Sequence, residues 1–181
     1  MIGILGIGMI AAVVGAVAFA TLRDGSTDAA AVEPITDPAE RERAGAAALA
    51  LVRYDPAQVG YQITFEPGRA GVRAQVDRSS KTIGVFLRRG DLPHVVAHDI
   101  AHELGHAYDQ ARMDASDRSE YLSRRSVPDA PWLPEGDSDY GVGAGDFAEV
   151  FALCHSSSPD FRSTLAPRPD NPCAVLPSGA R

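Results

Sequence analysis

His102 and His106 constrain this chain more than any other feature, because they lie four residues apart within the run His-Glu-Leu-Gly-His. The run belongs to a longer segment, 92–109, whose apolar side chains recur at three- and four-residue steps: Val96, Ile100, Leu104 and Ala107. Such spacing is typical of a helix with one buried face, and Pro93 suits its first turn. The segment therefore predicts a helix that presents both imidazoles on the same side.

Glu103 adds a carboxylate one position round this helix from His102. Both histidines can direct a ring nitrogen at one metal ion, while Glu103 reaches the water or carbonyl group beside it. In H-E-x-x-H sites the glutamate is the general base for a zinc-bound water. The segment thus predicts a Zn²⁺ site with His102 and His106 as ligands. His94 and His98 continue the spacing upstream but drift by roughly 40° per step, so we expect them at the helix surface or behind the ligands.

A third protein ligand is expected, because catalytic zinc sites usually have three and leave one position open. The place six residues after His106 is Arg112, which cannot serve, so a later helix must supply the ligand. Segment 145–154 (GDFAEVFALC) has helical apolar spacing and carries two carboxylates three residues apart, Asp146 and Glu149. Either could complete the site, and the longer reach favours Glu149.

Three short blocks resemble the anthrax-lethal-factor-like zinc metallopeptidases, a group within the gluzincins. They are HELGHAYD at 102–109, DYG at 139–141 and FAEVFA at 147–152. The resemblance implies zinc held by the two histidines and a carboxylate of the second helix, with Glu103 as base. It also implies that Tyr140 donates a hydrogen bond to the developing oxyanion.

The chain departs from the family pattern at the second helix. The family usually has an acidic ligand one turn before the glutamate of the FAE block, and that glutamate then supports a ligating histidine. Here the position one turn before Glu149 is Gly145, and the acid stands one residue later, at Asp146. The choice between Glu149 and Asp146 therefore stays open.

The rest of the chain predicts an α+β fold. Segments 61–65, 72–76 and 82–87 alternate apolar and polar residues, as strands of a small, mostly antiparallel sheet do. With a helix from 38 to 52, they give the order helix, three strands, motif helix, loop, ligand-bearing helix. This is a zincin-like domain over 38–155. In such folds the strand before the motif helix lies at the sheet edge, where a peptide substrate can add.

Residues 1–22 carry no charged side chain and would span roughly 33 Å as a helix, which predicts a transmembrane anchor. A cleaved signal peptide, with Ala18-Phe-Ala20 as its cleavage site, is the alternative. A flexible linker follows at 23–37. Cys154 and Cys173 could staple the Pro-rich tail, 156–181, by a disulfide that persists only outside the cytoplasm.

The formal net charge of −7 argues against a nucleic-acid partner. We therefore expect a membrane-tethered, extracytoplasmic zinc metallopeptidase that hydrolyses a peptide or protein substrate; if the leader is cleaved, the protein is secreted instead. Two alternatives remain. One is an inactive zincin-fold binding module at the membrane surface, and the other is an amidase acting on cell-wall peptides.

Overall fold

The computed structural model describes residues 33–134 and 138–181. The predicted anchor at 1–22 and all but the last residues of the predicted linker lie outside this part of the chain. Among the described residues, no helix has both the length and the apolar character needed to cross a bilayer.

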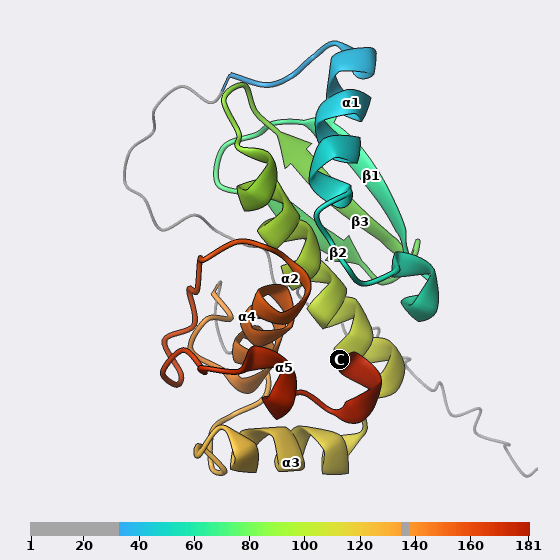
Figure 1. The fold of residues 1–181 in the computed structure, drawn as a ribbon. Coiled ribbons are helices and arrows are strands. Elements are labelled where there is room, and N and C mark those ends of the chain that lie inside the picture. The colour runs from blue at the N-terminus through green and yellow to red at the C-terminus, as the bar shows by residue number, and fades with distance from the viewer. Residues whose placement is uncertain (1–32, 135–137) are drawn as a thin grey trace, which may run out of the picture.

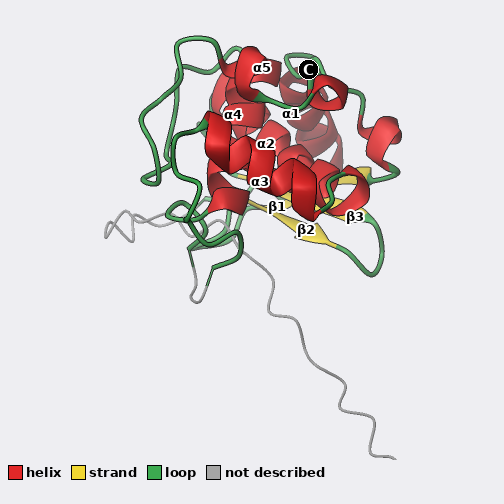
Figure 2. Cartoon of the chain, turned by 90° about the horizontal axis from the view of Figure 1, so that it is seen from below, coloured by secondary structure: helices red, strands yellow, loops and turns green. Residues whose placement is uncertain are grey.

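The described chain combines a three-stranded sheet with several helices, as an α+β fold requires (Figure 1). The longer helices lie on one side of the sheet (Figure 2). The strands are β1 (Gln62–Pro67), β2 (Ala74–Asp77) and β3 (Thr82–Leu87). The helices are α1 (Pro38–Leu49), α2 (Pro93–Arg112), α3 (Ala115–Arg124), α4 (Gly143–His155) and the short α5 (Pro172–Val175), with 3₁₀ turns η1 (Pro56–Val59) and η2 (Ser178–Ala180).

The sheet has the order β1-β3-β2 and differs from the prediction in two ways. β1 runs parallel to β3, whereas only β2 is antiparallel to it, so the expected mostly antiparallel sheet is wrong for one of the two strand pairs. β3 is also the central strand rather than an edge strand, so its backbone cannot accept a peptide substrate. Alternation of apolar residues indicates which face of a strand is buried, but it does not specify the neighbour or its direction.

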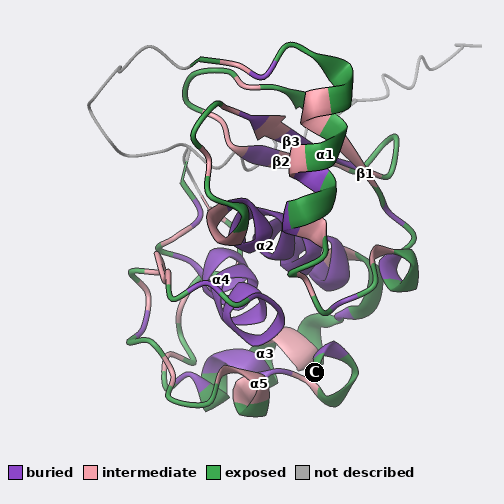
Figure 3. Cartoon of the chain, turned by 45° about the horizontal axis from the view of Figure 1, so that its top comes forward, coloured by how far each residue is buried: buried purple, intermediate pink, exposed green. Residues whose placement is uncertain are grey.

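Helix α2 is the predicted motif helix, and every residue from Val96 to Asp109 is buried (Figure 3). It packs on the sheet with α1 and contacts α4 along its other side. The contact with α4 is close at Gly105, where an added Cβ would lie 2.8 Å from the Cα of Ala148. Because Gly105 has no side chain, the backbone of α4 can approach α2 closely at this point.

A further helix, α3, occupies part of the segment expected to be a loop. Asp114 begins it with a capping box: its Oδ1 accepts from the backbone N–H groups of Ser116 and Asp117, at 2.8 and 2.9 Å. The Asp117 carboxylate in turn accepts from the Asp114 N–H at 3.1 Å. These bonds satisfy backbone donors that a helix start otherwise leaves unpaired.

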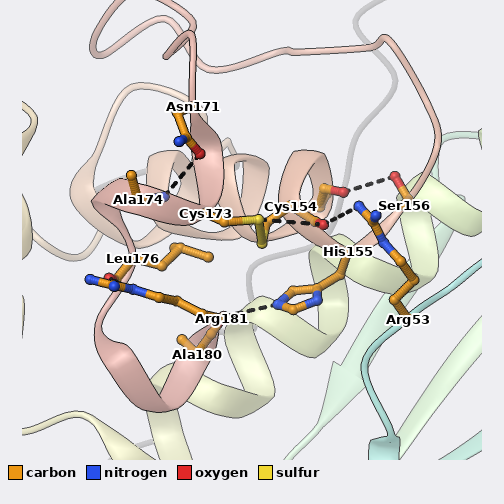
Figure 4. The surroundings of a disulfide bond; sticks show 11 residues. Arg53, Cys154, His155, Ser156, Asn171, Cys173, Ala174, Leu176, Ala180 and Arg181 are labelled. Carbon is orange, nitrogen blue, oxygen red and sulfur yellow. Dashed lines mark hydrogen bonds between the residues drawn. A yellow bond between two sulfur atoms is a disulfide. The ribbon is translucent and has the colours of Figure 1, made fainter.

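The C-terminal tail belongs to the same core. The predicted disulfide between Cys154 and Cys173 is present (Figure 4). Beyond it, Leu176 and Ala180 are fully buried, and the Ala180 carbonyl accepts a hydrogen bond from Nε2 of His155 at 2.8 Å. The disulfide therefore closes a loop that starts at the end of α4 and returns to it.

Opening this disulfide is expected to destabilise the fold. Replacing Cys173 by serine should lower the free energy of unfolding by about 3 kcal/mol, because the unfolded chain regains the freedom that a loop of this length loses. Urea unfolding of the variant and of the wild type measures the difference. Reduced wild-type protein is the control and should unfold with the variant; an unchanged midpoint after reduction would contradict the prediction.

Candidate metal centre

Three ligand atoms converge between α2 and the loop that precedes α4. The Nε2 atoms of His102 and His106 lie 3.1 Å apart. Oδ2 of Asp139 lies 2.7 Å from Nε2 of His106 and 3.6 Å from Nε2 of His102. Two imidazoles and a carboxylate thus meet with their coordinating atoms facing one another. All three residues are buried, with at most 8% of their surface exposed.

These distances fit a small divalent metal ion. Nitrogen and oxygen ligands about 2.05 Å from a tetrahedral zinc are separated from one another by about 3.3 Å, and the three observed separations bracket that value. The donor set also suits Zn²⁺, which accepts imidazole nitrogen and carboxylate oxygen. The three residues can therefore hold a divalent metal ion, and the two predicted histidines are among them.

Glu149 lies on the opposite side of the His102 ring. Its Oε1 is 2.8 Å from Nδ1 of His102, not beside Nε2. Burial alone would raise the pKa of Glu149, but hydrogen bonds from His102 and His98 hold it well below its usual range. The ionised carboxylate accepts a hydrogen bond from Nδ1 of His102, so Nε2 is the nitrogen of that ring that could bind a metal ion. The structure thus places Glu149 behind His102, so the prediction of Glu149 as the third member of the His102–His106 group is wrong.

Asp146 is not part of the group of converging ligand atoms. Its carboxylate forms a two-pronged ion pair with Arg125, at 2.7 and 3.0 Å. The hydroxyl groups of Tyr121 and Ser163 each donate to it at 2.6 Å. Asp146 is fully buried, and these four donors occupy both of its oxygens. Through these contacts Asp146 connects α4 to the end of α3 and to the loop that follows α4.

Asp139, rather than a carboxylate of α4, lies beside the two histidines. It is part of the DYG block, but nothing in the spacing of that block assigned it a role. Gly145 explains its position: a Cβ added there would lie 2.1 Å from the Asp139 carbonyl oxygen and 3.0 Å from its Cγ. The absence of a side chain at 145 makes room for the Asp139 carboxylate.

If this group holds a metal ion such as Zn²⁺, substitution of Gly145 by alanine should displace Asp139. The affinity for the metal should then fall by at least about tenfold, the size seen when support for a metal ligand is lost. Competition with a chelating dye measures the dissociation constant. Gly141→Ala is the matched control, because a Cβ there meets nothing closer than 3.6 Å. Equal affinities for the two variants would show that Asp139 does not depend on Gly145.

Glu103 is buried beside this cluster, with 1% of its surface exposed. Its Oε2 has no hydrogen-bond partner among the described residues. Burial raises the pKa of Glu103 to about 7, against the opposing charges of His106 and His102. A carboxyl group with a pKa near neutrality can both accept and release a proton, which is the property required of a general acid–base.

Tyr140 follows Asp139 and lies at the margin of the cluster. Its ring meets that of His102 edge to face, with 5.8 Å between the ring centres. Burial raises the pKa of its hydroxyl, while the neighbouring Arg162 guanidinium opposes that rise. The hydroxyl therefore stays protonated and able to donate a hydrogen bond. Sequence spacing alone did not indicate the contribution of Arg162, which comes from the loop after α4.

Comparisons with protein-family models, with curated proteins and with solved structures find no match for this chain.

Proposed function

We propose that this protein is a zinc-dependent metallopeptidase. The observation that carries the proposal is the convergence of His102, His106 and Asp139 within a few ångströms, next to a buried carboxyl group with an unpaired oxygen. In the proposal, Asp139 replaces the ligand expected from the second helix, and Glu149 orients His102. The three blocks that resemble the lethal-factor-like peptidases support the same assignment.

A zinc ion bound here would polarise a carbonyl group and make a water molecule more acidic. Glu103 would accept the proton of the attacking water and pass it to the leaving amine. Its unpaired Oε2 and near-neutral pKa suit both steps. The Tyr140 hydroxyl would donate to the oxyanion, a contribution typically worth about 3 kcal/mol in the transition state.

An extracytoplasmic position is part of the proposal. The Cys154–Cys173 disulfide supports it, because structural disulfides persist in oxidising compartments. The uncharged, apolar residues 1–22 support a membrane tether at the N-terminal end. The first described residues lie close to the end of β3, since the Ile35 N–H donates to the Leu87 carbonyl at 3.1 Å.

Metal depletion tests the activity directly. The full-length protein, in detergent, should cleave a library of quenched fluorescent peptides, lose that activity in chelator, and regain it with one equivalent of zinc. Peptides derived from bacterial cell walls form a second panel. Cleavage of that panel alone would assign an amidase, and failure of both panels with zinc bound would reject the peptidase proposal.

The burial of the site favours one alternative, a non-catalytic metal-binding module. Structural zinc sites are closed, and His102 and Glu103 have 0% and 1% of their surface exposed. The two functions differ in the number of positions left for exogenous ligands. A catalytic centre should bind a hydroxamate inhibitor in competition with substrate, whereas a closed structural site should bind none.

A further inference from the structure

His98 lies one turn before His102 on α2 and contacts the Glu149 carboxylate behind the candidate metal site. Its Nε2 is 3.2 Å from Oε1 of Glu149, the same oxygen that faces Nδ1 of His102. The side chains of all three residues are fully buried. We propose that His98 is a positioning residue, which holds the Glu149 carboxylate in place against His102. This inference rests on the proposed metal centre.

Three donors surround the Glu149 carboxylate and account for both of its oxygens. Oε1 lies between the two histidines, and Oε2 accepts the backbone N–H of Arg162 at 2.5 Å. Without His98, each oxygen of Glu149 would have one hydrogen bond, and the carboxylate could still tilt away from the His102 ring. The hydrogen bond from His98 holds Oε1, the oxygen that faces His102, in place. Both histidines lie on α2, which fixes their four-residue separation.

The hydrogen-bond pattern also indicates which ring nitrogen of His98 carries the donated proton. A carboxylate oxygen that lies between two imidazole rings accepts a hydrogen bond from each, so His98 donates to Glu149 from Nε2. Its Nδ1 is buried and has no hydrogen-bond partner among the described residues. Leaving a buried polar atom without a hydrogen bond is unfavourable, and an apolar residue would fill the same space without that cost. Within residues 33–134 and 138–181, the hydrogen bond to Glu149 is the one polar contact of this ring.

The arrangement extends the motif upstream, to His98-x-x-x-His102-Glu103-x-x-His106. Ligands of metal sites depend on the groups behind them, whose loss typically weakens metal binding by about 10–100-fold. His98 acts one step further out, through Glu149, so its loss should weaken zinc binding by about tenfold. Its effect should disappear when Glu149 is already neutralised.

The experiment compares His98→Leu, His98→Gln and His98→Asn in the full-length protein. Zinc dissociation constants come from chelator competition, and visible spectra of the Co²⁺ form report the ligand geometry. Leu removes the donor. Gln places an amide N–H at about the reach of Nε2, whereas Asn is too short. The matched control is His94→Leu, one turn further upstream on the same helix and only half-buried.

We expect Leu and Asn to weaken zinc binding about tenfold and alter the Co²⁺ spectrum, while Gln and the His94 control retain wild-type values. In a Glu149→Gln background, His98→Leu should add less than twofold. If His98→Leu does not fold, the contrast between Gln and Asn decides. Equal affinities for Gln and Asn, or full additivity with Glu149→Gln, would overturn the role of His98 alone. A parent protein that binds no zinc would overturn the metal centre as well, and two zinc ions per chain would make His98 a ligand.

Discussion

Replacement of Glu103 by glutamine is expected to lower kcat/KM for peptide hydrolysis by about 10²–10⁴-fold while leaving zinc bound. Glutamine has nearly the same volume, so the buried site should keep its shape. It cannot accept the proton of the attacking water, and this is the role that the unpaired Oε2 and the raised pKa of Glu103 indicate. None of the three ligand atoms belongs to this residue.

Steady-state kinetics together with the zinc content of the purified variant measure this effect. Glu103→Asp is a second variant for comparison. It keeps the carboxyl group on a side chain shorter by one methylene group, so its activity should lie between those of the wild type and the glutamine variant. Loss of zinc in the glutamine variant would make Glu103 part of the metal-binding set. Undiminished hydrolysis would remove it from the mechanism.

The second large effect is expected at Asp139. Changing it to asparagine should weaken zinc binding by more than about 100-fold, beyond the loss seen when only a supporting group is removed. Asparagine keeps the size of the side chain but removes the charge of the ligand oxygen. That oxygen lies 2.7 Å from Nε2 of His106. Titration with a zinc-buffered series measures the dissociation constant.

Two matched variants on α4 distinguish the contribution of Asp139 to zinc affinity from those of Glu149 and Asp146, the two carboxylates predicted from the sequence. Glu149→Gln should weaken zinc binding by about 10–100-fold, because His102 loses the acceptor behind its ring. Asp146→Asn should leave the affinity unchanged but destabilise the fold by about 3–5 kcal/mol, since Arg125 would remain buried without its partner. A larger loss of affinity at Asp146 than at Asp139 would reverse the assignment.

Local sequence patterns were sufficient to predict the helix that carries the motif. The spacing of Val96, Ile100 and Leu104 indicated its buried face. The same local information placed the three strands within two residues of their observed bounds. The Cys154–Cys173 disulfide was suggested by the sequence, because the chain has only two cysteines, one in the second predicted helix and one in the Pro-rich tail.

The sequence could not predict which carboxylate meets the two histidines. That choice depends on how Asp139, in the loop before α4, packs against Gly145. Asp139 lies outside the helix, so the periodicity of helical residues gives no information about this contact. Asp146 looked available as a ligand because its partner Arg125 follows α3, a short and mostly polar helix in a segment expected to be a loop. The parallel pairing of β1 with β3 was missed for a similar reason, because strand direction is decided by the connections between strands.

Direct determination of the metal and its ligands tests the central claim. The metal-free full-length protein, titrated with Zn²⁺, should bind one ion per chain, and X-ray absorption at the zinc edge should show two imidazole nitrogens with additional oxygen ligands. In the Asp139→Ala variant, the carboxylate contribution should disappear together with tight binding. No saturable zinc binding by the parent protein, or an unchanged spectrum and affinity in Asp139→Ala, would contradict the account.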